Sequence, residues 1–174
     1  MRDRRKELLE LLDRSGASLF TLLTRLTLRE DAAEELMQEL FLKLSNSRGF
    51  EKSISPDAYA RRTAINLAFD WRRKFRQKDK AQNFAYEVVS NDSSPLSKII
   101  RTEELEEMLD AIEKLNENGR QMIIMRYIQQ QSYEDIAEQI GKTTHQVRAL
   151  CSKAMTCLRD KMVTVSKKIS DKET

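Results

Sequence analysis

Apolar residues recur at helical spacing along most of this chain. Between Leu8 and Leu44 the clearest run steps by three, one, three, one and three residues, so its members share one face of a helix: Ala33, Leu36, Met37, Leu40, Phe41 and Leu44. The sequence has only four glycines and two prolines, too few for the many turns of a β-sandwich. We therefore expect an all-α protein.

A second amphipathic helix is predicted after the polar loop "SNSRGFEKS". Ser55 can cap its first turn, Pro56 suits the first helical position, and Asp57 complements the positive end of the helix dipole. Residues repeating every three or four positions form its predicted buried face: Ala60, Ala64, Leu67, Trp71 and Phe75. We interpret both aromatic residues as core and expect the neighbouring arginines nearer the surface.

The helical pattern lapses towards the middle of the chain, where Asn91 to Pro95 form a cluster of turn-forming residues. A further helical run follows, and Asn118 with Gly119 is predicted to end it. The expected organisation is two small helical domains joined by a flexible linker. Their predicted bounds are 1–80 for the first domain, 81–97 for the linker, 98–165 for the second domain and 166–174 for a charged tail.

Charge is distributed in blocks, although the formal net charge is only +3. Residues 61–80 contain eight Lys or Arg and two Asp, whereas 30–39 contain five acidic residues and 103–113 contain six, with no base in either. Segregation of this kind suggests polyanion contact at the basic faces and a different partner at the acidic ones. The alternative is that all of these are ordinary solvated helix faces.

The segment from Ser132 to Leu158 has the pattern of a helix-turn-helix. Ser132 with Asp135 forms one predicted capping box, Gly141 ends the short helix, and Thr143 opens a second box. The predicted inner positions are Ile136, Ala137 and Ile140 on the first helix, and Val147, Leu150, Cys151, Ala154 and Leu158 on the second. A generic helical hairpin is the alternative.

In a helix-turn-helix the second helix enters the DNA major groove, and exposed side chains near its N-terminus read base edges. Here these are Thr144, His145, Gln146, Arg148, Ala149, Ser152 and Lys153. Gln can pair with adenine, Arg with guanine, and Lys with a base or a phosphate. Five bases and one acid between residues 142 and 161 favour DNA binding over the generic hairpin.

The sequence gives little evidence for a membrane protein, a metal-binding protein or an enzyme. No apolar run approaches the roughly 20 residues of a membrane-spanning helix, and the N-terminus lacks the apolar core of a secretory signal, so we expect a soluble cytoplasmic protein without membrane insertion. Cys151 and Cys157 are interpreted as small core residues, and His145 has no partner for a metal site. With no phosphate loop or nucleophile motif, we expect no enzyme, metal or cofactor.

Three stretches in this order resemble the extracytoplasmic-function sigma factors of bacteria, which carry regions 2 and 4 of the sigma-70 architecture: "DAAEELMQELFLKL", "SPDAYARRTAINLAFDWRRKFR" and "LDAIEKLNENGRQMIIMRYIQQQSYEDIAEQIG". The resemblance covers nearly the whole chain. It implies an alternative sigma factor that brings core RNA polymerase to promoters and performs no covalent chemistry.

The resemblance also implies roles for individual residues. Glu35, Gln38 and Glu39 would contact the clamp helices of the largest polymerase subunit. Phe50 and the loop to Ser55 would form a pocket for a base flipped out of the minus-ten element, with Asn66 facing the same DNA. Several basic residues would hold phosphates around the melting promoter: Arg61, Arg62, Arg72, Arg73, Lys74 and Arg76.

The second domain would read the minus-thirty-five element, and its sequence departs from the usual family pattern. In and just after "HQVRAL", Arg148 and Lys153 keep basic positions, but Leu150 stands where a base is common and Ser152 where larger side chains occur. The family often has Pro where Asn116 lies. An anti-sigma protein held between the domains, and a monomeric free chain with weak DNA affinity of its own, are further expectations.

Two other functions are kept open. The chain could be a stand-alone helix-turn-helix regulator with a helical dimerisation domain, which predicts a stable homodimer and tight duplex binding without polymerase. Alternatively, the N-terminal half could be a protein-interaction module with no role in melting. In that case, charge reversal at Arg61 and Arg62 would leave promoter opening intact.

Overall fold

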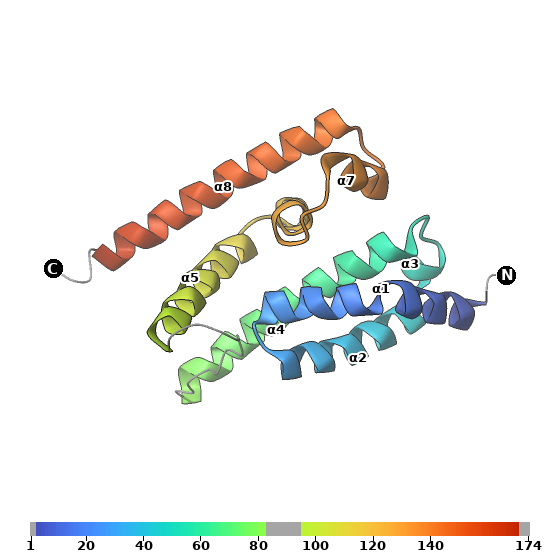
Figure 1. The fold of residues 1–174 in the computed structure, drawn as a ribbon, viewed down its shortest axis with the longest axis horizontal. Helices are drawn as coiled ribbons and strands as arrows, with labels where there is room; N and C mark the ends of the chain where they lie inside the picture. Colours follow the sequence, from blue (N-terminus) through green and yellow to red (C-terminus); the bar gives the residue numbers. More distant parts are fainter. Residues whose placement is uncertain (1–2, 83–94, 171–174) are drawn as a thin grey trace. The chain divides into compact units, whose positions relative to one another are not determined.

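A computed structural model describes residues 3–82 and 95–170 (Figure 1). Within these ranges every regular element is a helix, so the all-α prediction is confirmed. The chain divides into two compact units, residues 1–89 and 90–174. Most of the predicted linker, residues 83–94, lies outside the described residues. None of the described helices is both long and apolar enough to span a membrane.

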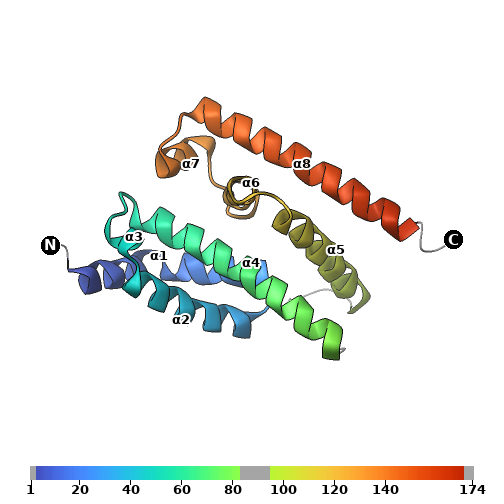
Figure 2. The ribbon, with the colours of Figure 1, turned by 180° about the vertical axis from the view of Figure 1, so that it is seen from behind.

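Unit 1 is built from three long helices that contact one another pairwise (Figures 1 and 2). They are α1 (Arg4–Thr27), α2 (Glu30–Asn46) and α4 (Pro56–Gln82), with the short α3 (Arg48–Glu51) between the last two. Leucines from α1 and α2 and small or aromatic residues from α4 fill the core. The face predicted for residues 33–44 is buried at Ala33, Leu36, Leu40 and Leu44 and partly buried at the other two positions.

The continuous apolar spacing between Leu8 and Leu44 conceals a sharp corner between α1 and α2. Leu28 adopts a left-handed conformation with φ of 59°, and its backbone N–H donates to Thr24 O at 2.8 Å. The Thr27 hydroxyl donates to Leu23 O at 2.8 Å and accepts from the Arg29 N–H at 3.3 Å. These bonds satisfy backbone groups at the corner without a glycine.

The predicted buried face of α4 is only partly correct. Ala60, Ala64 and Leu67 are buried, but Trp71 and Phe75 are only partly buried and stack on each other with ring centroids 4.7 Å apart. Because α4 contacts both α1 and α2, its buried face is wider than a single stripe. That face also includes Ile65, Ala68, Phe69 and Arg72.

The predicted start of α4 is confirmed. The Ala58 N–H donates to Ser55 Oγ at 3.3 Å, and the Tyr59 N–H donates to Ser55 O at 3.1 Å. The preceding polar segment is not entirely loop, since α3 forms within it and the Ser47 hydroxyl caps it by accepting from the Phe50 N–H at 3.1 Å.

Unit 2 contains α5 (Pro95–Glu113), α6 (Glu117–Ile123), a π-helical turn η1 (Ile124–Ile128), α7 (Tyr133–Ile140) and α8 (Thr144–Ser170). Helix α8 contacts α5, α6 and α7. A cluster of buried residues joins α6, the π-helical turn, α7 and α8: Met122, Met125, Ile136, Ala137, Val147 and Cys151. The part of the predicted tail that is described, residues 166–170, continues α8.

The helix-turn-helix prediction is confirmed in its local chemistry. The Asp135 N–H donates to Ser132 Oγ at 3.0 Å, and Gly141 ends α7 in the left-handed region with φ of 66°. Thr143 and Gln146 cap each other: the Gln146 N–H donates to Thr143 Oγ1 at 3.2 Å, and the Thr143 N–H donates to Gln146 Oε1 at 3.0 Å.

The predicted helix end at Asn118 and Gly119 is wrong. Helix α5 already ends at Glu113, and Asn116 caps α6 because its Oδ1 accepts from the Gly119 N–H at 2.8 Å. A Cβ on Gly119 would lie 3.1 Å from that oxygen. Glycine therefore serves the start of α6 rather than the end of α5.

Candidate functional site

The acidic side of α2 forms a continuous exposed face. Glu35, Gln38 and Glu39 are all exposed, while Leu36 and Leu40, next to them in the sequence, are buried. Glu39 pairs with Lys43 at 3.6 Å along the helix surface. The exposure of this face agrees with prediction.

Leu42 extends this acidic face by one helical turn and was not singled out from the sequence. Its side chain is 63% exposed. An exposed leucine beside carboxylates suits a protein partner, because apolar side chains inside a polar rim carry much of the binding energy at interfaces. The sequence signal for this position was that Leu42 follows Glu39 by three residues and Gln38 by four, which places all three on one face of the helix.

The basic side of α4 is present but smaller than predicted. Arg62, Arg73 and Lys74 are exposed, whereas Asn66 and Arg76 are partly buried. Arg73 Nη2 lies 3.3 Å from Asp70 Oδ1 in a surface pair. These side chains can approach a phosphate backbone that runs along α4.

Arg61 is partly buried and differs from its neighbour Arg62. Burial lowers the pKa of its guanidinium, while the Asp57 carboxylate acts in the opposite direction. Arg62 therefore carries the more accessible charge at this end of α4.

Arg72 is a correction to the predicted phosphate contacts. Its side chain is only 3% exposed, and Nη1 donates to Leu26 O at 3.2 Å, in the last turn of α1. It ties α4 to the α1–α2 corner. The Arg29 guanidinium carbon, 5.4 Å from the centroid of the Phe75 ring, adds a second contact between the same two parts of unit 1.

Phe50 is a second correction, because its ring is completely buried. It packs near Tyr59, with centroids 6.2 Å apart, and so positions the following loop instead of presenting an aromatic face to DNA. The apolar side chain that this loop exposes is Ile54, which has 103% relative exposure. A lone aliphatic residue inside the polar stretch "EKSIS" was the available sequence signal.

The loop that carries Ile54 is held at both ends. The Ser53 hydroxyl donates to Phe50 O at 2.7 Å, and Ser55 caps α4 on the other side. Asp57, in the first turn of α4, accepts from Arg14 Nε at 3.2 Å and from the Ser15 hydroxyl, which fastens this end of α4 to α1.

The Asp57 contact should make folding stability depend on pH. Burial by itself would raise the pKa of the Asp57 carboxyl, but hydrogen bonds from Arg14 and Ser15 outweigh it and hold the pKa below its ordinary value. The contact therefore stabilises the fold above the unfolded pKa of about 4, and this is lost as the pH falls through the lower folded pKa. Carboxyl NMR titration should show the depressed pKa. In Asp57→Asn, the urea midpoint of unfolding should fall less steeply at acid pH than in the wild type. An ordinary pKa for the Asp57 carboxyl would contradict the assignment.

On α8 the predicted DNA-facing residues lie largely at the surface. His145, Gln146, Arg148, Ala149, Ser152 and Lys153 are exposed, and Thr144 is partly buried. The capping bond uses Gln146 Oε1, so the amide nitrogen of the same side chain is not occupied by it.

Tyr133 at the start of α7 orients two arginines and was not anticipated from the sequence. The guanidinium carbons of Arg126 and Arg148 lie 4.4 and 5.3 Å from its ring centroid. Arg126 Nη1 also donates to Gln131 O at 2.8 Å. The ring therefore holds Arg148 against α7.

The cysteines only partly follow the prediction. Cys151 is buried, and burial raises the pKa of its thiol, but Cys157 is exposed. Both thiols are free. Within residues 3–82 and 95–170, no group of three or more His, Cys, Asp or Glu is placed to hold a metal ion.

Comparison with known proteins gives two family matches. Residues 11–79 match the family model described as Sigma-70 region 2, and residues 105–158 match the one described as Sigma-70, region 4. Each match falls within one of the two compact units.

A curated protein and a solved structure are also similar. The probable RNA polymerase sigma factor RfaY of Xanthomonas campestris pv. campestris is 25% identical over 137 residues, which is 76% of this chain and 34% of RfaY. The chain thus spans about a third of that relative. The co-crystal structure of the sigma factor RpoE in complex with the anti-sigma factor NepR from Bartonella quintana aligns with a TM-score of 0.49 and 20% identity, covering 93% of this chain and 98% of that one.

Proposed function

Because this chain belongs to the sigma-70 family, as a factor of the extracytoplasmic-function type, we propose that it directs bacterial core RNA polymerase to specific promoters. In this role it is a non-enzymatic initiation factor that acts in the cytoplasm. The observation that carries the proposal is the presence, in one chain, of an exposed acidic face in region 2 and an exposed helix-turn-helix face in region 4.

Each exposed face receives one task in this proposal. The acidic face of α2, with Glu35, Gln38 and Glu39, docks on the clamp helices of the largest polymerase subunit. The loop around Ile54 and the start of α4 engage the minus-ten element as it melts. Residues at the start of α8 read the minus-thirty-five element as duplex, in the manner of other recognition helices.

Affinity and specificity come from different residues. Arg62, Arg73 and Lys74 neutralise phosphates, a contribution that weakens as salt rises. Arg148 and Gln146 offer groups that can read base edges. Arg72 has no direct part in binding because it is buried. An anti-sigma partner and a monomeric free chain remain part of the proposal on grounds of family resemblance.

Ile54 is expected to contribute to promoter opening. If its exposed side chain is buried against an unstacked minus-ten base, Ile54→Ala should reduce open-complex formation by roughly tenfold, the equivalent of one buried aliphatic side chain. Stability should change by no more than about 0.5 kcal/mol, because the side chain packs against nothing. Permanganate reactivity of minus-ten thymines measures opening.

A matched control for Ile54 is Leu9→Ala, which shortens another exposed aliphatic side chain of unit 1 at 53% exposure. Leu9 lies on α1, outside the proposed DNA contacts, so opening should be unchanged. Equal effects of the two substitutions would remove Ile54 from the site.

The function as a whole is tested by reconstitution. The full chain is mixed with purified core RNA polymerase and a pool of promoter fragments, and transcripts are mapped. The sigma-factor role predicts co-elution with core and initiation at a restricted set of promoters that core alone does not use. Failure to bind competent core, together with a stable dimer that binds duplex DNA by itself, would favour the stand-alone regulator instead.

The interaction-module alternative is separated by Arg62→Glu, since Arg62 is the exposed member of the predicted pair with Arg61. Loss of promoter opening with core binding retained supports a role of α4 in melting. Opening at the wild-type rate would leave region 2 with docking alone.

A further inference from the structure

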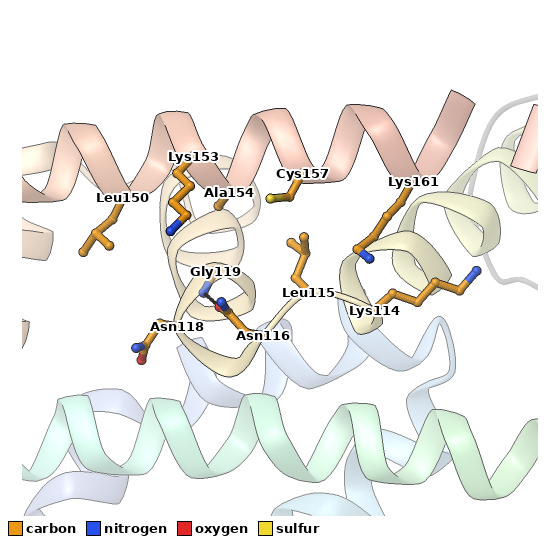
Figure 3. Close-up of a pocket in the computed structure, with 10 residues that line it drawn as sticks. All are labelled: Lys114, Leu115, Asn116, Asn118, Gly119, Leu150, Lys153, Ala154, Cys157 and Lys161. Atoms are coloured by element: carbon orange, nitrogen blue, oxygen red, sulfur yellow. Dashed lines mark hydrogen bonds between the residues drawn. The ribbon is translucent and has the colours of Figure 1, made fainter. Parts of the chain in front are cut away.

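Unit 2 contains a hollow of about 360 Å³ beside α8 that the proposed polymerase and promoter contacts do not explain (Figure 3). Its apolar lining comes from Leu115, Leu150 and Ala154. The remaining lining residues are Lys114, Asn116, Asn118, Gly119, Lys153, Cys157 and Lys161. The volume falls in the range of small-molecule sites, which combine an apolar surface with a few polar groups.

The charge of the lining has one sign. Lys114, Lys153 and Lys161 all contribute, and the lining includes no acidic residue. Figure 3 shows Lys153 and Lys161 extending from α8 towards the residues that join α5 and α6. Across the part of the chain that the structure describes, no carboxylate forms an ion pair within 4.0 Å with any of the three lysines. A bound anion would complement the positive charge of this lining.

The geometry of α6 keeps the hollow open. Asn116 Oδ1 is occupied by the Gly119 N–H, so the side-chain group that Asn116 has left to offer is its amide nitrogen, a donor. A Cβ on Gly119 would lie 3.5 Å from Ala154 Cβ and 3.7 Å from Leu115 Cβ, which places this glycine against the apolar lining. Donors and ammonium groups surround an apolar surface.

We propose that this hollow binds a small phosphorylated molecule with an apolar or aromatic body. The body would rest on Leu115, Leu150 and Ala154, and the phosphates would lie among the ammonium groups, since lysine binds phosphate as a point charge. Carboxylates fit less well, because a single carboxylate supplies one charge for three lysines.

Occupancy would also affect DNA binding, a step that rests on the proposed function. Lys153 both lines the hollow and belongs to the proposed minus-thirty-five contacts. A ligand that neutralises it removes one cation from the DNA interface. The coupling is reciprocal, so DNA would weaken the ligand by the same factor.

The binding site is tested with three probes on the full chain: ATP, tripolyphosphate and adenosine. ATP carries both parts of the predicted ligand, tripolyphosphate only the anion, and adenosine only the aromatic body. Calorimetry at low salt should show ATP binding at least tenfold more tightly than either of the other two. ATP should also slow alkylation of the exposed Cys157 thiol, with the buried Cys151 as internal reference.

Two sets of variants localise the effect. Lys114→Ala with Lys161→Ala should weaken ATP at least tenfold, whereas Lys142→Ala with Arg159→Ala removes the same charge from exposed positions outside the lining and should leave ATP binding nearly unchanged. Cys157→Phe should fill part of the hollow and weaken ATP more than tripolyphosphate. The site is refuted if ATP and tripolyphosphate bind equally, or if both charge pairs reduce ATP binding alike.

The coupling is measured separately by anisotropy of a labelled promoter duplex. Saturating ATP should weaken duplex binding severalfold in the wild type but not in the chain with Lys114→Ala and Lys161→Ala. Failure of the free chain to bind duplex in every sample would overturn the coupling but not the proposed function, which expects weak DNA affinity of the free chain, and the calorimetric result would still decide the site. Duplex affinity unaffected by bound ATP would overturn the coupling.

Discussion

Replacing Arg72 with alanine is expected to lower the free energy of unfolding of unit 1 by about 2–4 kcal/mol. The side chain is buried, its stem fills space between α4 and the α1–α2 corner, and its Nη1 donates to Leu26 O at 3.2 Å. Alanine leaves a cavity and removes a donor from a carbonyl in the last turn of α1. Few exposed arginines have an effect of this size.

Urea unfolding followed by fluorescence measures this effect, because Trp71 is the only tryptophan and lies in unit 1. Arg73→Ala is the matched control: it removes the same side chain one position later, where it is exposed and forms a surface pair with Asp70. Its cost should stay below about 1 kcal/mol. Arg72→Met, which keeps most of the volume, should fall between the two. Equal urea midpoints for Arg72→Ala and Arg73→Ala would show that the Arg72 side chain does not stabilise the contact between α4 and the α1–α2 corner.

The predictions that held are those decided by residues a few positions apart. Ser132, Gly141 and Thr143 were identified from the sequence because a cap depends on the side chain itself and on a backbone group three or so residues away. The same local chemistry identified Ser55 at the start of α4. The helix-turn-helix and its exposed face therefore followed from the sequence.

The errors concern contacts between distant parts of the chain. Arg72 and Leu26 are 46 residues apart, and spacing along α4 does not reveal that a second helix covers the neighbouring flank. For the same reason, spacing along the chain predicted Trp71 as a core residue, although it is only partly buried, and did not reveal that Phe50 is buried. At the α1–α2 corner, Leu28 adopts a left-handed conformation that leucine rarely takes, so residue type gave no signal there.

Reversing two charges on α2 is expected to have the largest effect on function. Glu35→Lys with Glu39→Lys should weaken binding to core RNA polymerase by about 100-fold or more, roughly 3 kcal/mol, because each change replaces an attraction with a repulsion at the docking face. At position 39 the change also sets a second ammonium group beside Lys43, whose present partner is Glu39 at 3.6 Å. Both side chains are exposed, so unit 1 should remain folded.

General electrostatics must be separated from a specific docking face, and α1 provides the control. Glu10→Lys with Asp13→Lys changes the net charge by the same amount at exposed positions of the same unit. Long-range attraction depends on total charge, so both double variants should lose a similar small amount of affinity at low salt. This shared loss should vanish at about 0.3 M salt, because the distance over which charges interact in solution becomes shorter as salt rises. The excess loss for the α2 pair should persist there. If the two pairs lose affinity equally at every salt concentration, the acidic face of α2 is not the docking surface, and the polymerase contact must lie elsewhere in the chain.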